Sequence, residues 1–342
     1  VGPQSGIGHF VAELVDALQA HEDAPELIPY VLSLRARRDA IRIGARYIPF
    51  PASVAHRAWG WGDRPDVDRW IQPADVVHGT NFVVPPSRRS ARVMTIHDCS
   101  FVRHPQWCSA PVLAMERAVR RAIRNGAWVH APSEFTASEV TELLDADPQR
   151  VVVVPHGVPH LSRASGLGVA TGIRDLIDRG PYVLAIGTIE PRKNLHRLVV
   201  AFGLLAARMP NVSLVIAGAD GPARPEIDAA IDSLQPGARA RVVLTGYVNN
   251  ATRTALLEGA AVVAYPSLYE GFGFPVLEAM VAGVPVVAAQ TGATSEVAGD
   301  AALLVDPLDP DALADALVRV LDDPGLAGSL VASGRKRADG YS

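Results

Sequence analysis

Short apolar runs of strand length alternate with helical segments along almost the whole chain. In the first half, the strand-like runs lie at residues 27–34, 74–78, 93–97, 128–131 and 151–154. In the second half, they lie at 182–187, 213–217, 242–244, 261–264, 286–288 and 303–305, with helical segments at 195–208, 226–234, 251–258, 275–282 and 311–321. This alternation is typical of parallel sheets that helices cover on both faces. The sequence therefore predicts an α/β protein with two Rossmann-like, doubly wound domains.

The 342 residues suffice for two domains, each with its own core. We expect an N-terminal domain at residues 1–160, a linker rich in Gly, Ser and Arg at 161–180, and a C-terminal domain at 181–342. The chain opens in a glycine turn where a strand would be usual, and it ends at Ser342 without a closing element. We therefore expect a first strand and a terminal helix to be missing.

The composition is that of a globular protein, with 49% hydrophobic and 20% charged residues. The formal net charge of −4 argues against general affinity for nucleic acids. Cys99 and Cys108 have no zinc-type spacing, so free thiols in a reducing cytosol are expected. No apolar run approaches the ~20 residues of a membrane span, and no signal peptide is recognisable. These features predict a cytoplasmic protein.

The stretch YEGFGFPVLEAMVAG at residues 269–283 follows a predicted buried strand and carries two glutamates. Gly271 and Gly273 allow a ligand to approach the backbone closely, and Pro275 suits the start of a helix. The unpaired N–H groups of that helix N-terminus, over residues 273–277, can bind phosphate oxygens. The sequence therefore predicts an anion site at this turn, with the helix beginning at Pro275.

Glu270 and Glu278 lie on either side of this predicted anion site. Glu270, at the strand end, can accept hydrogen bonds from sugar hydroxyls. Glu278, in or near the first helical turn, can accept them from a ribose. The alternative is that Glu278 only complements the helix dipole and that Glu270 is a solvated loop residue.

A second anion-binding pattern is GTIEPRKN at residues 187–194, after the first strand of the second domain. Arg192 and Lys193 are adjacent cations on a strand-to-helix turn, and we expect them to point toward a cleft. Such a pair can grip phosphate and neutralise the charge of a diphosphate leaving group. A solvated pair is the alternative, but two anion-binding patterns in one domain favour a functional site.

His97 and Asp98 fall at the end of the predicted strand 93–97, where catalytic groups of parallel sheets lie. His97 can donate a hydrogen bond to a sugar hydroxyl or lie against a developing oxocarbenium ion. Asp98 can fix the tautomer of His97 or accept a hydrogen bond from the acceptor hydroxyl. A purely structural His-Asp pair is the alternative. Ser133 and Glu134 are assigned to structure, as the N-terminal cap of the next helix.

The pattern E-x7-E with G-F-G-x-P-x-L-E-A-M, followed by G-x-P-V at residues 283–286, resembles the signature of retaining glycosyltransferases of family 4. The resemblance extends over almost the whole chain and is more specific in the C-terminal half. It implies the GT-B fold, with two Rossmann-like domains that face each other across a cleft. It also implies hexose transfer from a nucleotide-diphosphate sugar to a glycan or lipid-linked hydroxyl, without a metal or other cofactor.

The motifs IHDCSF and IEPRKN look most like those of mannosyltransferase-type members, so GDP-mannose is the first expected donor. Glucose, rhamnose and N-acetylglucosamine donors remain open. The resemblance implies catalytic roles for His97, Glu270, Arg192 and Lys193. It implies donor binding by Gly6, Gly8, Arg192, Lys193, Gly271, Phe272, Gly273, Val276, Leu277, Glu278, Tyr247 and Val248.

Several alternatives remain open at this stage. The Gly6-Ile7-Gly8 turn before the first helix can equally be a tight connection, and Tyr247 and Val248 can be packing residues. A sugar-nucleotide epimerase and a non-catalytic nucleotide-sugar-binding protein share the expected architecture. No D-x-D metal motif stands in a suitable context, because Asp66 and Asp68 fall in a predicted loop.

Arginine is concentrated in two places, residues 35–46 and the helix that carries Arg117, Arg120, Arg121 and Arg124. Both can be solvated helix faces. The other interpretation is contact with an anionic membrane surface or a lipid-phosphate acceptor. The resemblance adds support to peripheral contact with the inner face of the membrane.

Overall fold

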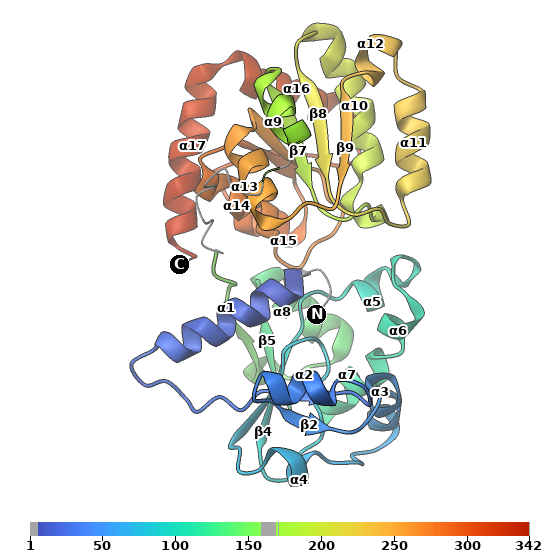
Figure 1. Ribbon diagram of the computed structural model, residues 1–342, viewed down its shortest axis with the longest axis vertical. Helices are drawn as coiled ribbons and strands as arrows, with labels where there is room; N and C mark the ends of the chain where they lie inside the picture. Colours follow the sequence, from blue (N-terminus) through green and yellow to red (C-terminus); the bar gives the residue numbers. More distant parts are fainter. Residues whose placement is uncertain (1–5, 159–168, 170, 342) are drawn as a thin grey trace. The chain divides into compact units, whose positions relative to one another are not determined.

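The computed structural model describes residues 6–158, 169 and 171–341, and it divides into two compact units, Val1–His156 and Gly157–Ser342 (Figure 1). Each unit is described by itself below. No helix in the described ranges is both long enough and apolar enough to cross a membrane.

Unit 1 is built on a parallel sheet of four strands in the order β3-β4-β5-β6. The strands are β3 (Val76–Gly79), β4 (Ala91–Thr95), β5 (Trp128–Ala131) and β6 (Val151–Val153). A separate parallel pair consists of β1 (Tyr30–Leu32) and β2 (Arg46–Ile48). The sequence predicted all of these strands except β2, which is only three residues long and begins at an arginine.

The helices of unit 1 surround a core that contains the fully buried residues Met94, Ile96, Val119 and Val140. They are α1 (Gly6–Ala20), α2 (Arg37–Arg42), α3 (Ala52–Trp61), α4 (Asp68–Ile71), α5 (Ser100–Arg103), η1 (Pro105–Trp107), α6 (Ala110–Leu113), α7 (Glu116–Arg124), α8 (Glu134–Leu144) and η2 (Pro148–Arg150). Ser133 caps α8 by accepting a hydrogen bond from the Thr136 N–H at 3.1 Å, which confirms its structural assignment.

Unit 2 contains a parallel sheet of six strands in the order β12-β11-β10-β7-β8-β9. The strands are β7 (Tyr182–Ile186), β8 (Ser213–Ala217), β9 (Val242–Gly246), β10 (Val262–Tyr265), β11 (Val286–Ala289) and β12 (Leu303–Val305). The chain winds outward from β7 to β9 and then returns to the other side of β7 at β10. The carboxyl ends of β7 and β10 therefore flank the topological switch point, which is where ligands bind in such sheets.

Helices cover both faces of this sheet. One buried cluster joins it to α10 (Leu195–Arg208), α11 (Arg224–Asp232) and α16 (Pro310–Asp322). A second joins the other face to α9 (Thr171–Asp178), α13 (Asn250–Gly259), α14 (Phe274–Ala282) and α15 (Gly292–Ala298). The remaining helical segments are η3 (Pro191–Lys193), α12 (Pro236–Arg239) and α17 (Pro324–Asp339). The prediction of an α/β protein with two Rossmann-like sheets is confirmed.

Two expectations about helices were wrong. Residues 171–178 lie in the predicted linker but form α9, because Leu176 packs into the core of unit 2. No helical segment was predicted beyond residue 321, yet α17 spans 16 residues there. Asp323 caps α17 through hydrogen bonds from the N–H groups of Gly325 and Leu326, at 2.9 and 3.0 Å. This cap offsets the low helix propensity of the glycines in α17.

Candidate active site

The two loops at the switch point of unit 2 bring together side chains that are far apart in the sequence. The segment η3 follows β7 and carries Arg192 and Lys193. The loop after β10 carries Glu270. Since β7 and β10 are hydrogen-bonded neighbours, the ends of both strands meet at one edge of the sheet.

Glu270 forms the centre of a buried charge cluster. Lys193 Nζ donates to Glu270 Oε1 at 2.6 Å and to the Tyr265 hydroxyl at 2.8 Å. Arg192 Nη1 donates to the other carboxylate oxygen of Glu270. Glu270 and Lys193 are each only 8% exposed, so their contact is shielded from water, whereas the Arg192 side chain is 24% exposed. The sequence predicted the three charged residues, but not Tyr265 or their direct pairing.

The cluster fixes the ionisation of Glu270. Burial alone would raise the pKa of this carboxyl, but the charges of Arg192 and Lys193 outweigh it and lower the pKa to about 2. Glu270 is therefore a carboxylate at neutral pH. Burial lowers the pKa of Lys193, whereas the charge of Glu270 opposes that shift.

Neither Arg192 nor Lys193 is an isolated charge. Arg192 Nε also donates to Glu190 Oε2 at 2.9 Å. Two cations are thus balanced by two carboxylates. An anion that binds to Arg192 and Lys193 therefore competes with Glu270 for them, because a buried cation needs a negative partner.

The helix N-terminus expected at residues 273–277 is present, with a shift of one residue. Gly273 is the N-cap residue of α14 and has a φ of 109°, a left-handed conformation that favours glycine. The helix begins at Phe274, and Pro275 is its second residue. Val276 and Leu277 are fully buried and Phe272 is 5% exposed, so these three residues pack into the core. Their side chains are therefore not available to a ligand, and the Val276 N–H already donates to the Gly273 carbonyl at 3.0 Å.

Glu278 is the fifth residue of α14, and therefore lies in the second turn rather than the first. It is 3% exposed and accepts a hydrogen bond from Arg253 Nη2 on α13. The predicted ribose contact would have to coexist with this ion pair. Sequence analysis missed Arg253, because it lies on a different helix and outside any motif.

In unit 1, His97 lies two residues beyond β4 rather than within the strand. Its Nε2 donates to the carbonyl of Thr80 at 2.9 Å, and its ring meets Phe10 and Phe82 edge to face. Because Nε2 carries the proton, the neutral ring offers Nδ1 as an acceptor. Burial lowers the pKa of His97, which favours this neutral form.

Asp98 does not fix the tautomer of His97, in contrast to the expectation. Asp98 Oδ1 accepts a hydrogen bond from the N–H of Ser100, the first residue of α5, at 2.9 Å. The Thr80 carbonyl orients His97 instead. Asp98 is therefore assigned to structure.

Three further histidines lie near His97, and no sequence motif pointed to them. His78 Nε2 lies 2.8 Å from Thr95 Oγ1, which lies 3.0 Å from His130 Nδ1. His130 Nε2 donates to the Val154 carbonyl at 2.8 Å, so Thr95 must donate to His130 and His78 to Thr95. The ring of His156 lies 5.6 Å from that of His97.

The other predicted donor-binding residues lie outside the charge cluster. Gly6 and Gly8 belong to the first turn of α1, rather than to a turn that precedes it. Tyr247 follows β9 and is 58% exposed, and Val248 is partly buried against the core of unit 2. Strand β8 separates β9, which precedes both residues, from β7.

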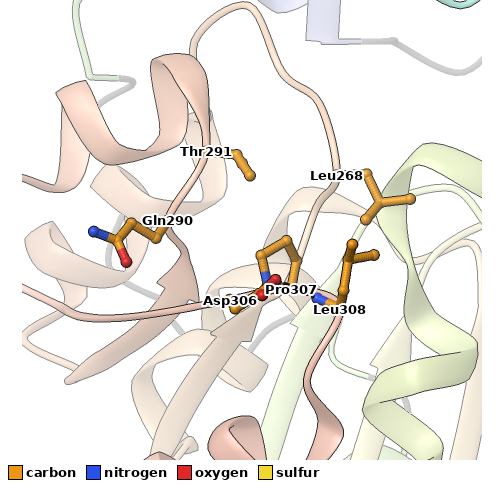
Figure 2. Close-up of a pocket in the computed structure, with 6 residues that line it drawn as sticks. All are labelled: Leu268, Gln290, Thr291, Asp306, Pro307 and Leu308. Atoms are coloured by element: carbon orange, nitrogen blue, oxygen red, sulfur yellow. Dashed lines mark hydrogen bonds between the residues drawn. The ribbon is translucent and has the colours of Figure 1, made fainter.

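A cavity of about 430 Å³ opens beside the cluster, at the carboxyl ends of β10, β11 and β12 (Figure 2). It is lined by Leu268, Gln290, Thr291, Asp306, Pro307 and Leu308. Leu268 belongs to the loop that carries Glu270, and its N–H donates to the Arg192 carbonyl at 2.8 Å. No group of three or more His, Cys, Asp or Glu in the described ranges is arranged to hold a metal ion.

Two family models match the chain. The one described as glycosyltransferase family 4 matches residues 4–160, and the one described as glycosyl transferases group 1 matches residues 173–337. The O-antigen chain mannosyltransferase B of Escherichia coli is 30% identical over 99% of this chain and 93% of its own length. The chain belongs to glycosyltransferase family 4. The resemblance identified from the motifs is confirmed.

Solved structures agree with this assignment. The Anabaena protein HepE, in complex with UDP, superposes on this family 4 glycosyltransferase with a TM-score of 0.71 at 18% identity, covering 100% of this chain and 93% of its own. Sucrose-phosphate synthase from Thermosynechococcus elongatus gives a TM-score of 0.68 at 20% identity, covering 98% and 89%. These likenesses confirm the GT-B fold.

Proposed function

We propose that this family 4 glycosyltransferase transfers a hexose from a nucleotide-diphosphate sugar to a hydroxyl of a glycan or lipid-linked acceptor, with retention of anomeric configuration. The observation that carries this proposal is the cluster of Arg192, Lys193 and Glu270 at the switch point of unit 2. It combines cations suited to a diphosphate with a carboxylate suited to sugar hydroxyls. The N-terminus of α14, directly after Glu270, adds backbone N–H donors.

In the proposed mechanism, the diphosphate binds to Arg192 and Lys193 and loosens their contacts with Glu270. The carboxylate of Glu270 then accepts hydrogen bonds from the transferred sugar. As the glycosidic bond breaks, negative charge grows on the leaving diphosphate oxygen, and both cations stabilise that charge. This oxygen takes the proton of the attacking acceptor hydroxyl on the same face of the sugar, which gives retention.

His97 and Glu278 have supporting roles in this proposal. The Nδ1 atom of His97 accepts a hydrogen bond from a sugar hydroxyl, since its Nε2 proton is engaged by Thr80. Glu278 accepts from the ribose while it stays paired with Arg253. No metal or cofactor is needed in this account, because Arg192 and Lys193 supply the positive charge that a metal ion would otherwise provide.

We propose GDP-mannose as the donor. Two observations support it: the mannosyltransferase-like motifs IHDCSF and IEPRKN, and the relationship to the Escherichia coli mannosyltransferase over nearly the whole chain. The experiment is a thermal shift assay with GDP, UDP, ADP and dTDP and their hexoses, because a ligand that binds only the folded state raises the melting temperature. Stabilisation by GDP, and more by GDP-mannose, is expected. No shift with any nucleotide would contradict the proposal.

We also propose that unit 1 contacts an anionic membrane surface through residues 34–46. Leu34, Ile41 and Ile43 are 58 to 67% exposed there. The segment also contains five arginines and one acidic residue, and its only ion pair in the described ranges joins Arg42 to Asp39. Exposed aliphatic side chains among unpaired cations are typical of surfaces that bind anionic lipids.

The other arginine cluster, on α7, has a structural explanation instead. Arg117 donates to the Gly60 carbonyl at 3.1 Å and covers the ring of Trp61. Arg120 pairs with Glu116 at 2.8 Å, and Arg121 pairs with Asp63 at 3.1 Å. Arg117 and Arg121 thus join α7 to the end of α3 and the segment after it, whereas Arg120 pairs within α7. The proposed membrane contact is therefore restricted to residues 34–46.

A further inference from the structure

Asn194 lies directly after Lys193, is fully buried, and uses its side chain to join three loops at the switch point. Its Nδ2 donates to the carbonyl of Pro266 at 3.0 Å and to that of Pro307 at 2.7 Å. Its Oδ1 accepts from Arg197 Nη1 at 2.7 Å. With two carbonyls and one guanidinium as partners, the orientation of the amide is unambiguous.

The backbone of Asn194 has an unusual conformation for a non-glycine residue. Its φ of 57° and ψ of 29° are left-handed, and only two other non-glycine residues in the described ranges have a positive φ, Phe82 and Asp145. Asparagine tolerates this conformation better than most residues. Here it ends η3 and begins α10, so the chain turns immediately after Arg192 and Lys193.

The loop that carries Glu270 is held from several sides. Asn194 binds the Pro266 carbonyl, Thr291 Oγ1 donates to the Ser267 carbonyl at 3.1 Å, and the Leu268 N–H donates to the Arg192 carbonyl at 2.8 Å. Of these residues, Asn194 also binds the loop after β12, because its side chain donates to the Pro307 carbonyl. It thereby links the loop of the cations, the loop of Glu270 and the wall of the neighbouring cavity.

We propose that Asn194 is a positioning residue for glycosyl transfer, which sets the separation between the cations Arg192 and Lys193 and the carboxylate Glu270 through its two hydrogen bonds to Pro266 and Pro307. This inference rests on the proposed function. Asn194 touches neither the diphosphate nor the sugar in that account. It acts through the two loops that do.

The test compares Asn194→Gly, Asn194→Asp and the control Asp145→Gly. Glycine keeps the left-handed backbone but removes the side-chain bonds. Aspartate keeps the size and the acceptor for Arg197, but it has no protons to donate to the two carbonyls. Asp145→Gly makes the same type of change at another left-handed residue, at the end of α8 in unit 1.

Steady-state kinetics are measured well below the melting temperature of each variant. Both Asn194 variants are expected to lower kcat about 10- to 100-fold, the effect of a displacement on the order of 1 Å in a catalytic group, with the donor KM changed less than about threefold. Asp145→Gly is expected to leave both constants unchanged. An unaltered kcat in Asn194→Gly, or full activity in Asn194→Asp, would overturn the positioning role.

A second readout does not depend on activity. In a crystal structure of Asn194→Gly, Lys193 Nζ and Glu270 Oε1, which lie 2.6 Å apart in the native chain, are expected to separate beyond hydrogen-bonding distance. An unchanged contact would overturn the inference. Absence of transfer by the native chain would count against the proposed function instead, while this distance would still decide the role of Asn194.

Discussion

Lys193 Nζ lies 2.6 Å from Glu270 Oε1, although the two residues are 77 positions apart in the chain. The contact exists because β7 and β10 are neighbours at the switch point of the sheet. Glu270 therefore neutralises positive charge of Arg192 and Lys193 before any donor binds. In the proposed function, donor binding would therefore exchange the anionic partner of Arg192 and Lys193, from Glu270 to the diphosphate.

The first prediction concerns the charge of Glu270. Glu270→Gln should lower kcat by about 10²- to 10³-fold, the usual effect of removing one electrostatic contact to the transition state. The affinity for the nucleoside diphosphate should stay within about threefold of the native value. Arg192 and Lys193 are still present to bind the diphosphate, and the competing charge of Glu270 is gone. Calorimetry and steady-state kinetics measure the two effects separately.

Glu190→Gln is the matched control for this change. Glu190 contacts the same arginine at 2.9 Å, but its side chain is 36% exposed. Exposed ion pairs contribute little, so kcat should change by less than about threefold. Equal loss of transfer and of diphosphate binding in Glu270→Gln would contradict the role assigned to Glu270.

The second prediction concerns the turn that leads to η3. A Cβ atom at Gly218, after β8, would lie 1.9 Å from the Gly187 carbonyl oxygen, so Gly218→Ala must displace this turn. The expected cost is about 1 to 3 kcal/mol, or roughly 2 to 10 °C in melting temperature, together with a lower kcat. Gly237→Ala, which has open space around its Cβ, is the control and should not lower stability. Equal melting temperatures for the two variants would refute the packing argument.

The third prediction concerns acid stability of unit 1. Burial lowers the pKa of His78 from its ordinary 6.5 to about 4 and that of His156 to about 2. The unfolded chain therefore binds protons first as the pH falls below 6.5, and unit 1 loses stability from there down to the folded pKa values. Glu270, with its pKa lowered from 4.5 to about 2, affects unit 2 only below pH 4.5.

Tryptophan fluorescence can test this prediction, because all five tryptophans lie in unit 1, at positions 59, 61, 70, 107 and 128. The melting temperature from fluorescence should be constant above pH 6.5 and fall steadily between pH 6.5 and 4.5. His78→Gln should reduce that slope. A melting temperature that is the same at pH 7.5 and pH 5 would show that the histidines do not contribute in this way.

The fourth prediction concerns the surface at residues 34–46. The native chain should bind vesicles that contain about one third phosphatidylglycerol, but not vesicles of pure phosphatidylcholine. A variant with Arg37, Arg38 and Arg42 changed to Gln should bind on the order of 100-fold more weakly, at about 1 kcal/mol for each arginine near the surface. Ile41→Ser with Ile43→Ser should also weaken binding, because the apolar contact is lost. Co-sedimentation measures how much of the native chain and of each variant binds to the vesicles.

Val54→Ser is the control for this surface, since Val54 is a similarly exposed aliphatic residue, at 56%, on α3. It should bind vesicles like the native chain. Binding that is insensitive to the Arg37, Arg38 and Arg42 changes would rule out this surface as the contact.

The sequence predicted the sheets well, because buried parallel strands are continuous apolar runs and their periodicity needs no partner to be recognised. It also predicted Arg192, Lys193 and Glu270, since each stands at a strand end in a motif. The helix α17 was missed because its three glycines lower helix propensity. Packing explains the glycine at position 334, because a Cβ atom there would lie 3.0 Å from the Met280 side chain on α14.

The contacts within the site could not be predicted in the same way. The pairings of Glu270 with Lys193 and of Glu278 with Arg253 depend on which strands and helices become neighbours, and local patterns do not contain that information. The bonds of Asn194 to Pro266 and Pro307 depend on three loops at once. The role predicted for Asp98 was wrong, because its carboxylate accepts a hydrogen bond from the Ser100 N–H at the start of α5 instead of orienting His97.

The most direct test of the account is the anomeric configuration of the product. The native chain is incubated with GDP-α-mannose and a soluble mannoside acceptor, and the one-bond C1–H1 coupling of the new linkage is measured by NMR. The account predicts an α-linked mannose, formed by the native chain and almost lost in Glu270→Gln. A β-linked product, or undiminished transfer by Glu270→Gln, would contradict it.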